Sequence, residues 1–408
     1  MPYYSFVLLC YNNWNLTEQA IMTLLDSFSS RHKKRGIELI VVNNGSIDET
    51  KTSIEKLKKT YSHEVEIIPV HLKDNMGYPV GVNKGLANCR GQIITVLNND
   101  LVFPSNWFDG IVHALENNSS IGVAAPFLSY GSGPENVKEK FDSQEEMKEF
   151  AKQFMEKNKK RIIYTQRIIG ACLSFRKELL NLIGGNDFWF GLGHFDDDDW
   201  SLRAGITGYK LAIIGASFVE HIGTVTFRQD QKTLRASLRA NRKKFEMKWS
   251  KSGISPGKRK EIIDNTEYSK DKHFFPLKKD DFNNPSFRNN HNQKNMKENI
   301  LLVADWTNDF SQWKNKLVEI NNLLLSKNKY DLYLWVPTTY FSKIEVKQEI
   351  EKMIDVNSSH IHFVFDEIYP VDIMNFLIKY QIFIAVEGDY VNRYFKYLLE
   401  NTPVRIFN

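Results

Sequence analysis

Apolar strand-like segments and amphipathic helical segments alternate over roughly the first 125 residues of this chain. The strand-like segments are residues 5–10, 37–42, 65–71 and 91–97. The helical segments are residues 16–29, 48–61 and 80–89. Helices that connect buried strands cover both faces of a mostly parallel sheet, so this part of the chain is expected to form an α/β domain.

Polar side chains follow three of these strands at the point where each strand ends. They are Tyr11 to Asn13, Asn43 to Ser46, and Asn98 to Asp100. The carboxyl ends of parallel strands form one edge of a sheet, and ligands bind at that edge in folds of this class. We therefore expect the three clusters to line one pocket.

The same alternation returns near the end of the chain. Strands are expected at residues 300–304, 332–336, 361–365, 382–386 and 404–407, with helices at 312–326, 344–354, 370–379 and 391–400. This pattern predicts a second, smaller doubly wound α/β domain. Its first strand is followed by Asp305-Trp306-Thr307 rather than by a glycine-rich phosphate loop, and its residues indicate no chemistry. The predicted domains are residues 1–250 and 299–408, joined by a polar linker over 251–298.

Composition limits the class of protein and its partners. The formal net charge of +5 is small for 408 residues and gives little support for a nucleic-acid partner. Cys10, Cys89 and Cys172 lie far apart, as expected for reduced thiols. With no signal peptide and no apolar run of about 18 residues, the chain is expected to be cytoplasmic. The basic helix expected at 231–249 either packs on its own domain or lies on the anionic inner face of a membrane.

Four consecutive carboxylates, Asp196 to Asp199, stand between Phe195 and Trp200. Adjacent carboxylates repel one another, so cations, hydroxyl groups or helix N-terminal amides are expected to accompany them. The run therefore indicates a functional site, although helix capping would account for Asp198 and Asp199.

Seven segments, in this order, resemble family 2 glycosyltransferases of the GT-A fold. They are FVLLCYNN, VVNNGSIDET, DNMGYPVGVNKGL, ITVLNNDLVFPSNW, GACLSFRKELLNLIGG, FDDDDWSLR and VEHIG. The resemblance covers about the first 250 residues, and the alternating C-terminal segment resembles one half of a GT-B glycosyltransferase. It implies an inverting enzyme that moves a hexosyl, N-acetylhexosaminyl or deoxyhexosyl group from a UDP- or dTDP-sugar. The acceptor would be a hydroxyl group of a glycan, a lipid carrier or a protein.

The resemblance also implies roles for the acidic run and for a metal. Asp197 falls at the position of the general base, with Asp196 as an acceptor-binding or backup base. Asp199 and Arg203 are four residues apart, the spacing of a helical ion pair, and are expected to be structural. Asn98-Asn99-Asp100 replaces the family's Asp-x-Asp motif, so Asp100, together with His221, would bind Mn²⁺ or Mg²⁺.

Donor and acceptor contacts are expected from the strand ends and from the segments beside them. The expected donor-binding residues are Tyr11, Asn13, Asn43, Asn75, Gly77, Asn83, Lys84, Asn98 and Asn99. The expected acceptor- or sugar-binding residues are Gly170, Ala171, Trp189 and Phe190. Trp189 and Phe190 would stack on a sugar ring, with core packing as the alternative.

Two other functions remain open from the sequence. A sugar nucleotidyltransferase also uses aspartate-held metal, but it usually has a glycine-rich basic loop after its first strand, where this chain has YNNWN. A non-catalytic protein that binds carbohydrate or nucleotide sugar is the other alternative. Asn98 and Asn43 support it, because the family commonly has aspartate at both positions.

Overall fold

The computed structural model of the protein describes residues 1–61, 65–223, 231–250, 257–283, 297–307, 312–326, 329–354 and 360–407. Two compact units divide the chain. Unit 1 consists of residues 1–187, 196–231 and 259–270. Unit 2 consists of residues 188–195, 232–258 and 271–408.

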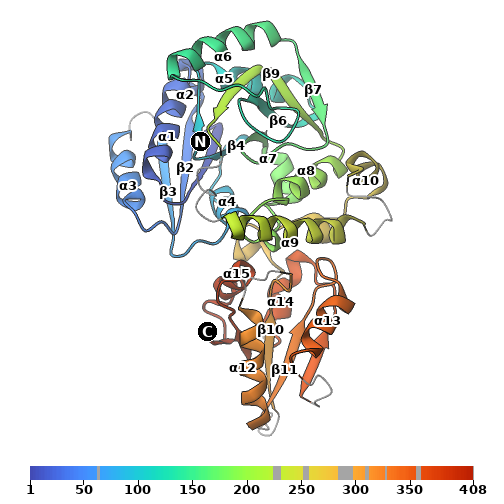
Figure 1. The fold of residues 1–408 in the computed structure, drawn as a ribbon. Coiled ribbons are helices and arrows are strands. Elements are labelled where there is room, and N and C mark those ends of the chain that lie inside the picture. The colour runs from blue at the N-terminus through green and yellow to red at the C-terminus, as the bar shows by residue number, and fades with distance from the viewer. Residues whose placement is uncertain are drawn as a thin grey trace. The chain divides into compact units, whose positions relative to one another are not determined.

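Unit 1 is built on a mixed, mostly parallel sheet (Figure 1). Over the described residues its strand order is β3-β2-β1-β4-β8-β6-β9-β5, and β7 pairs with β9. The strands are β1 (Tyr4–Cys10), β2 (Ile37–Asn44), β3 (Glu66–Leu72), β4 (Ile93–Asn98), β5 (Leu101–Val102), β6 (Ile121–Leu128), β7 (Ile162–Thr165), β8 (Cys172–Arg176) and β9 (Lys210–His221). Strands β1 to β4 are parallel, whereas β8 runs antiparallel to β4 and β6.

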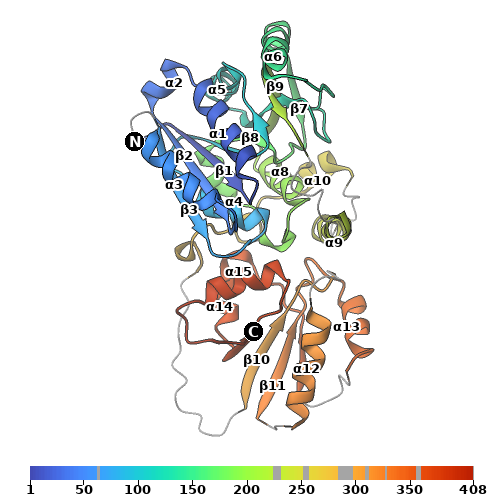
Figure 2. The same ribbon diagram turned by 60° about the vertical axis from the view of Figure 1, so that its left-hand side comes forward.

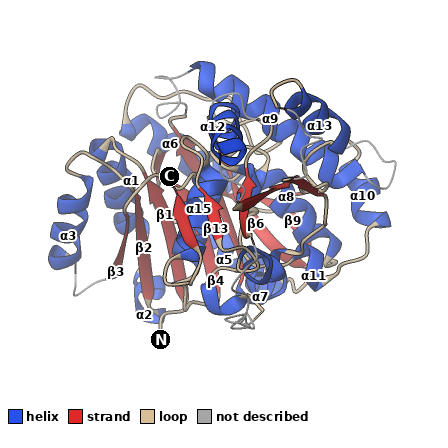
Figure 3. Cartoon of the chain, turned by 90° about the horizontal axis from the view of Figure 1, so that it is seen from below, coloured by secondary structure: helices blue, strands red, loops and turns tan. Residues whose placement is uncertain are grey.

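Helices cover this sheet, as expected for strands that are buried along their whole length. Figure 3 shows α1 and α3 beside β1, β2 and β3. The helices of unit 1 are α1 (Trp14–Ser27), α2 (Ser30–Arg35), α3 (Thr50–Thr60), α4 (Tyr78–Leu86), α5 (Trp107–Asn117), α6 (Gln144–Asn158), α7 (Lys177–Ile183), α8 (Asp196–Ile206) and α10 (Arg259–Asn265). The prediction of an α/β domain is confirmed.

The strand register brings the predicted polar clusters to one edge of the sheet. In the parallel pairing of β1 with β2, Cys10 stands opposite Asn43, and in the pairing of β1 with β4, Leu9 stands opposite Asn98. The chain therefore leaves all three strands at the same level. The residues that follow them, including Asn12 and Asp100, start from a common edge.

Unit 2 is the smaller doubly wound domain predicted from the alternating pattern. Its parallel sheet has the order β12-β11-β10-β13-β14 over the described residues. The strands are β10 (Glu298–Val303), β11 (Tyr330–Trp335), β12 (Ile361–Val364), β13 (Ile382–Ile384) and β14 (Arg405–Phe407). The helices are α9 (Gln231–Trp249), α11 (Lys270–His273), α12 (Trp313–Ser326), α13 (Lys343–Glu351), α14 (Ile373–Leu377) and α15 (Tyr390–Leu399). Figure 2 shows α12 and α13 on one side of β10 and β11, with α14 and α15 on the other.

The structure divides the chain differently from the predicted boundaries. Residues 188–195 and helix α9 belong to unit 2, although both lie within the predicted first domain. The predicted linker, in turn, contributes helix α10 to unit 1. The composition of residues 251–298 did not indicate this division, because the short helix α10 lies within a polar stretch. None of the helices in the described part of the chain is long and apolar enough to cross a membrane. The three cysteines are free thiols, as predicted.

Gly45, after β2, allows two loops of the polar edge to approach each other. Its φ is +76°, and a Cβ atom there would lie 2.6 Å from the backbone nitrogen of Asn75. We expect Gly45→Ala to lower the free energy of unfolding by about 2–4 kcal/mol, from left-handed strain and from displacement of the opposing backbone. Gly208→Ala is the control, because Gly208 has φ +89° with nothing within 4 Å, and we expect it to show the strain alone. Urea denaturation measures both, and equal losses would contradict the close approach.

Candidate active site

The acidic run forms the first turn of α8, so the helix begins with the carboxylates rather than after them. A helix N-terminus attracts negative charge, which partly offsets the repulsion among the four side chains. Asp196, Asp198 and Asp199 are buried, whereas the Asp197 side chain is 17% exposed. Burial, followed by the charge of Asp197, raises the pKa of the Asp196 carboxyl well above its usual range. Asp196 therefore tends to hold a proton, and Asp197 is the carboxylate of the pair that remains accessible.

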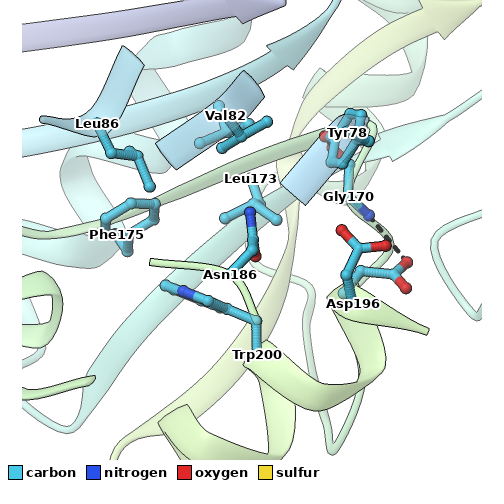
Figure 4. A pocket seen from close by; sticks show the side chains of 11 residues that line it. Tyr78, Val82, Leu86, Gly170, Leu173, Phe175, Asn186, Asp196 and Trp200 are labelled. Atoms are coloured by element: carbon cyan, nitrogen blue, oxygen red, sulfur yellow. Dashed lines mark hydrogen bonds between the residues drawn. The ribbon is translucent and has the colours of Figure 1, made fainter. Parts of the chain in front are cut away.

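The backbone of Gly170 links Asp197 to a partly buried tyrosine on another element. The Gly170 N–H donates to Asp197 Oδ2 at 3.1 Å, and the Gly170 carbonyl accepts from the Tyr78 hydroxyl at 2.8 Å. Tyr78 is the first residue of α4, which follows the polar segment after β3. Figure 4 shows Tyr78 and Gly170 next to Asp196. Sequence analysis named Gly170 but missed Tyr78, because the tyrosine contacts it only after the sheet has formed.

The same peptide segment connects to the end of β4 and hence to Asp100. The backbone N–H of Asn98 donates to the Ala171 carbonyl at 2.9 Å. Burial raises the pKa of Tyr78 well above its usual range, and the negative charges of Asp196, Asp197 and Asp100 raise it further. Both predicted catalytic-site carboxyl groups, Asp197 and Asp100, therefore affect the pKa of Tyr78. The structure brings Asp100 and Asp197 to the same region of unit 1.

A cavity of about 20 Å³ lies under this region, with room for about one water molecule (Figure 4). Its polar lining comes from the Tyr78, Asn186, Asp196 and Asp197 side chains, and Trp200 and Phe175 close its apolar side. The cavity is too small for a sugar, so any substrate must bind on the exposed side of Asp197.

Asp100 and His221, the two residues predicted to bind a metal, face each other. The imidazole Nε2 of His221 lies 3.3 Å from Asp100 Oδ1, and Leu101 pairs with His221 between β5 and β9. The other ring nitrogen, Nδ1, lies 3.0 Å from the Tyr130 carbonyl, which can only accept, so Nδ1 carries a hydrogen. In neutral histidine, Nε2 would then direct a lone pair at the carboxylate. Two acceptors at this distance are stable only with a proton or a cation between them.

The pKa of His221 is shifted in the direction that its contact with Asp100 requires. Burial by itself would lower it, but the neighbouring Asp100 carboxylate and the Tyr130 carbonyl outweigh burial, and the pKa is raised.

Close by in sequence, Asn98 Oδ1 is buried and has no hydrogen-bond partner among the described residues. These oxygen and nitrogen atoms are the kinds of ligand that suit Mn²⁺. No group of three or more His, Cys, Asp or Glu side chains suited to a metal occurs in the described part of the chain.

Two arginines that sequence analysis missed neutralise Asp198. Arg167 Nε lies 3.0 Å from Asp198 Oδ1, and Arg259 contacts the same oxygen at 2.5 Å. Arg167 also lies 3.7 Å from Asp197 Oδ2, so it is the cation nearest to the accessible carboxylate. Arg167 stands in the loop between β7 and β8, and Arg259 begins α10 in the expected linker. Neither position carries a sequence signal.

Asp199 and Arg203 form the structural ion pair that their spacing predicted. Arg203 Nε lies 2.8 Å from Asp199 Oδ2, and both side chains are completely buried. The guanidinium also donates to the carbonyls of Ile183 and Gly185 at 2.7 and 2.8 Å. These bonds join the first turn of α8 to the turn after α7 and fix the direction in which the acidic run points.

The polar edge expected to hold the donor is organised by asparagine side chains. Asn43 accepts from the Ser46 N–H at 2.9 Å, which shapes the turn after β2. Asn75 Oδ1 accepts from the Gly77 N–H, and Asn44 bridges to the same segment through Asn75 Oδ1 and the Gly77 carbonyl. Asn44 is an organiser of this edge that the residue-by-residue analysis did not single out.

The remaining predicted donor-binding residues have different surroundings. The Asn83 side chain both accepts from and donates to the Asn186 backbone at 2.7 and 2.8 Å, which explains its burial. Asn99 donates to Thr17 Oγ1 at 2.9 Å. Tyr11 and Asn13 lie on the loop after β1, where Asn13 has a left-handed backbone with φ +55° and precedes α1. Lys84 lies in the last turn of α4.

Trp189 and Phe190 are core residues of unit 2, which corrects the prediction that they stack on a sugar. Trp189 is 2% exposed, and its ring packs on Tyr340 and against Trp335 and Phe395. Phe190 is completely buried. Their place just before the acidic run suggested a role in the site. The structure favours the alternative, core packing, because the chain passes into unit 2 over these residues.

The Asp199–Arg203 pair leads to a direct stability test. Removing one partner of a buried ion pair leaves an uncompensated charge, so we expect Asp199→Asn to lower the free energy of unfolding by about 3–5 kcal/mol. Arg242→Gln is the control, because its ion pair with Glu246 is exposed; we expect a loss of about 0.5 kcal/mol or less. Denaturant titration followed by circular dichroism measures both. A loss near the control value for Asp199→Asn would show that the pair does not hold α8 in place.

Comparison with known proteins identifies the part of the chain that carries this edge. Residues 5–183 match the model of the family described as "Glycosyl transferase family 2". The chain is 25% identical over 127 residues to an uncharacterized glycosyltransferase of Haemophilus influenzae, covering 31% of this chain and 37% of that protein. It is 26% identical over 123 residues to the minor teichoic acid biosynthesis protein GgaA of Bacillus subtilis, covering 30% and 26%. The matches thus span about a third of these relatives.

Two solved structures illustrate the more distant likeness. The mannosyltransferase PcManGT from Pyrobaculum calidifontis, solved with GDP-Man and Mn²⁺, has a TM-score of 0.44 and 16% identity, covering 64% of this chain and 68% of that one. Residues 1–349 of TarS from S. aureus have a TM-score of 0.45 and 13% identity, covering 64% and 69%. The family match ends at Ile183, before the acidic run begins. The likeness to glycosyl transferase family 2 therefore covers residues 5–183 of the chain.

Proposed function

We propose that this chain transfers a sugar from a nucleoside-diphosphate donor to an acceptor hydroxyl group, with inversion at the anomeric carbon. The observation that carries the proposal is the link from Tyr78 through Gly170 to Asp197, beside the strand end that leads to Asp100. It supports one site with an accessible carboxylate and a second carboxylate suited to a cation. The family match over residues 5–183 supports the reaction class.

Asp197 is the general base of this proposal. Its carboxylate is accessible, and the Gly170 N–H fixes one of its oxygens. The acceptor hydroxyl attacks the anomeric carbon from the side opposite the diphosphate, and its proton passes to Asp197 as the new glycosidic bond forms. Arg167 lies 3.7 Å from Asp197 Oδ2, so a cation stands beside the proposed base. Asp196 is buried and tends to be protonated, so we assign it to holding Asp197 in place rather than to proton transfer.

Asn98, Asp100 and His221 would hold the divalent cation. Their atoms fit one, since Nε2 of His221 faces the Asp100 carboxylate and Asn98 Oδ1 has no partner among the described residues. A bound Mn²⁺ or Mg²⁺ would neutralise the charge that develops on the departing diphosphate. The Tyr130 carbonyl orients the His221 ring for this purpose.

The polar edge of the sheet would bind the nucleotide. The loops after β1, β2 and β3 join there through Asn12, Ser46, Asn44 and Asn75. Asn43 shapes this edge, since its side-chain oxygen accepts from the Ser46 N–H. We propose a UDP- or dTDP-sugar as the donor. The acceptor is proposed as a hydroxyl group of a glycan, a lipid carrier or a protein.

The base assignment is tested by Asp197→Asn. The amide cannot take a proton, so we expect kcat for transfer from a responsive UDP- or dTDP-sugar to fall about 10²–10⁴-fold, with KM for the donor little changed. Nucleotide release in the presence of Mn²⁺ measures the rate. Asp264→Asn is the control, because Asp264 is an exposed residue of α10 that pairs with exposed Lys260. Unchanged turnover in Asp197→Asn would refute the assignment. Donor binding by the parent without any turnover would favour the non-catalytic alternative.

The cation assignment is tested by Asp100→Asn and His221→Gln. Each removes one proposed ligand, so we expect Mn²⁺ binding in the presence of UDP to weaken about tenfold or more. Electron paramagnetic resonance of free Mn²⁺ measures the binding without reference to activity. His113→Gln is the control, because His113 is an exposed residue of α5. If both variants bind Mn²⁺ as the parent does, the cation lies elsewhere.

A further inference from the structure

The sheet of unit 2 changes direction between β10 and β13. From β10 the chain builds β11 and β12 on one side, then crosses back to place β13 and β14 on the other. The loops that leave β10 and β13 therefore diverge. In doubly wound folds, the crevice outside the carboxyl ends of such strands is where ligands bind.

A cavity of about 170 Å³ opens at this point, well above the roughly 10–15 Å³ that one water molecule requires. Asp305 follows β10, and Gly388 and Tyr390 follow β13. Arg393, one turn further along α15, and Thr233, Ser237 and Asn241 of helix α9 also contribute polar groups to the wall. The space can therefore hold a small organic molecule surrounded by polar groups.

A buried network fixes the floor of the cavity. Lys244 Nζ lies 2.5 Å from Asp305 Oδ2 and donates to the Trp189 carbonyl at 2.7 Å, and the lysine side chain is completely buried. The backbone N–H of Asp305 donates to Asp389 Oδ2 at 2.7 Å. Burial, followed by the charge of Asp305, raises the pKa of the Asp389 carboxyl. The positions of these groups are fixed without a ligand, so the Asp305 carboxylate is held at the cavity wall.

The charges in this wall argue against a phosphate ligand. Phosphate loops place glycine and backbone N–H groups after the first strand. Here Asp305, which is 5% exposed, occupies that place. A doubly charged diphosphate would lie against a carboxylate, whereas a neutral ligand rich in hydroxyl groups would not.

Carboxylate, guanidinium and aromatic groups together suit a sugar ring. A carboxylate accepts from hydroxyl groups, a guanidinium donates to them in a planar fork, and an aromatic face covers the apolar side of the ring. The Arg393 guanidinium lies 4.9 Å from the centre of the Tyr390 ring, so these two side chains are held together at the cavity. We propose that unit 2 binds a neutral saccharide unit in this cavity. The site goes beyond the proposed transfer reaction and does not depend on it.

Saccharide binding to the full chain tests the proposal. The probes are glucose, galactose and N-acetylglucosamine, followed by saturation-transfer difference NMR, with UDP and inorganic phosphate as charged comparisons. We expect at least one sugar to bind the parent. We also expect Ser237→Leu, which fills the cavity, and Arg393→Ala to weaken that binding about tenfold or more, as the loss of one charged hydrogen-bonding partner implies. Arg239→Ala is the matched control, because Arg239 is an exposed arginine of α9.

Each other result overturns the proposal. If none of the three sugars binds, or if Ser237→Leu and Arg393→Ala bind as the parent does while circular dichroism shows both folded, the cavity is not a saccharide site. If Ser237→Leu instead removes binding of UDP or phosphate, the ligand class is wrong. Asp197→Asn separates this site from the transfer site. We expect it to lose transfer but keep the sugar signal that Ser237→Leu removes, and loss of that signal in Asp197→Asn would place the site in unit 1.

Discussion

Gly170 provides the contact on which the arrangement of the site depends. Its carbonyl accepts from Tyr78 and its N–H donates to Asp197, so the backbone of one residue connects helix α4 with the start of α8. The two bonds join residues 92 and 27 positions apart in the chain. The N–H and the carbonyl of Gly170 belong to adjacent peptide planes that meet at its Cα atom, so movement of either helix would act on the same residue.

The four consecutive carboxylates have different surroundings in the fold. Asp199 is neutralised within the fold by Arg203, Asp198 by Arg167 and Arg259, and Asp196 by burial that favours its protonated form. Asp197 is left with a hydrogen bond to backbone and with access to solvent. The helix N-terminus supports all four. The three enclosed residues therefore let the fourth carry a negative charge at an open position.

Local sequence patterns were sufficient to predict most helices and strands. They do not show which distant residues come into contact. The periods predicted strands β1 to β4 of unit 1 and the strands of unit 2. The 9–98 and 10–43 pairings follow from strand ends that the sequence marks with asparagine. Asp199 with Arg203 was predictable because helical spacing alone brings them together. Tyr78, Arg167 and Arg259 were not, since each reaches the acidic run from a distant part of the chain. The sugar-stacking prediction for Trp189 was wrong because the sequence does not distinguish an aromatic residue in a core from one beside a sugar.

The route of the chain through its two units has a consequence for how the protein tolerates being cut. Phe188–Phe195 and helix α9 pack with the last part of the sequence, while Arg259 returns to the acidic run. A stop codon near residue 250 would remove Tyr340, on which Trp189 packs, and Arg259, one of the cations beside Asp198. Each unit is formed by separate stretches of the chain, so a cut that divides the sequence there divides both units.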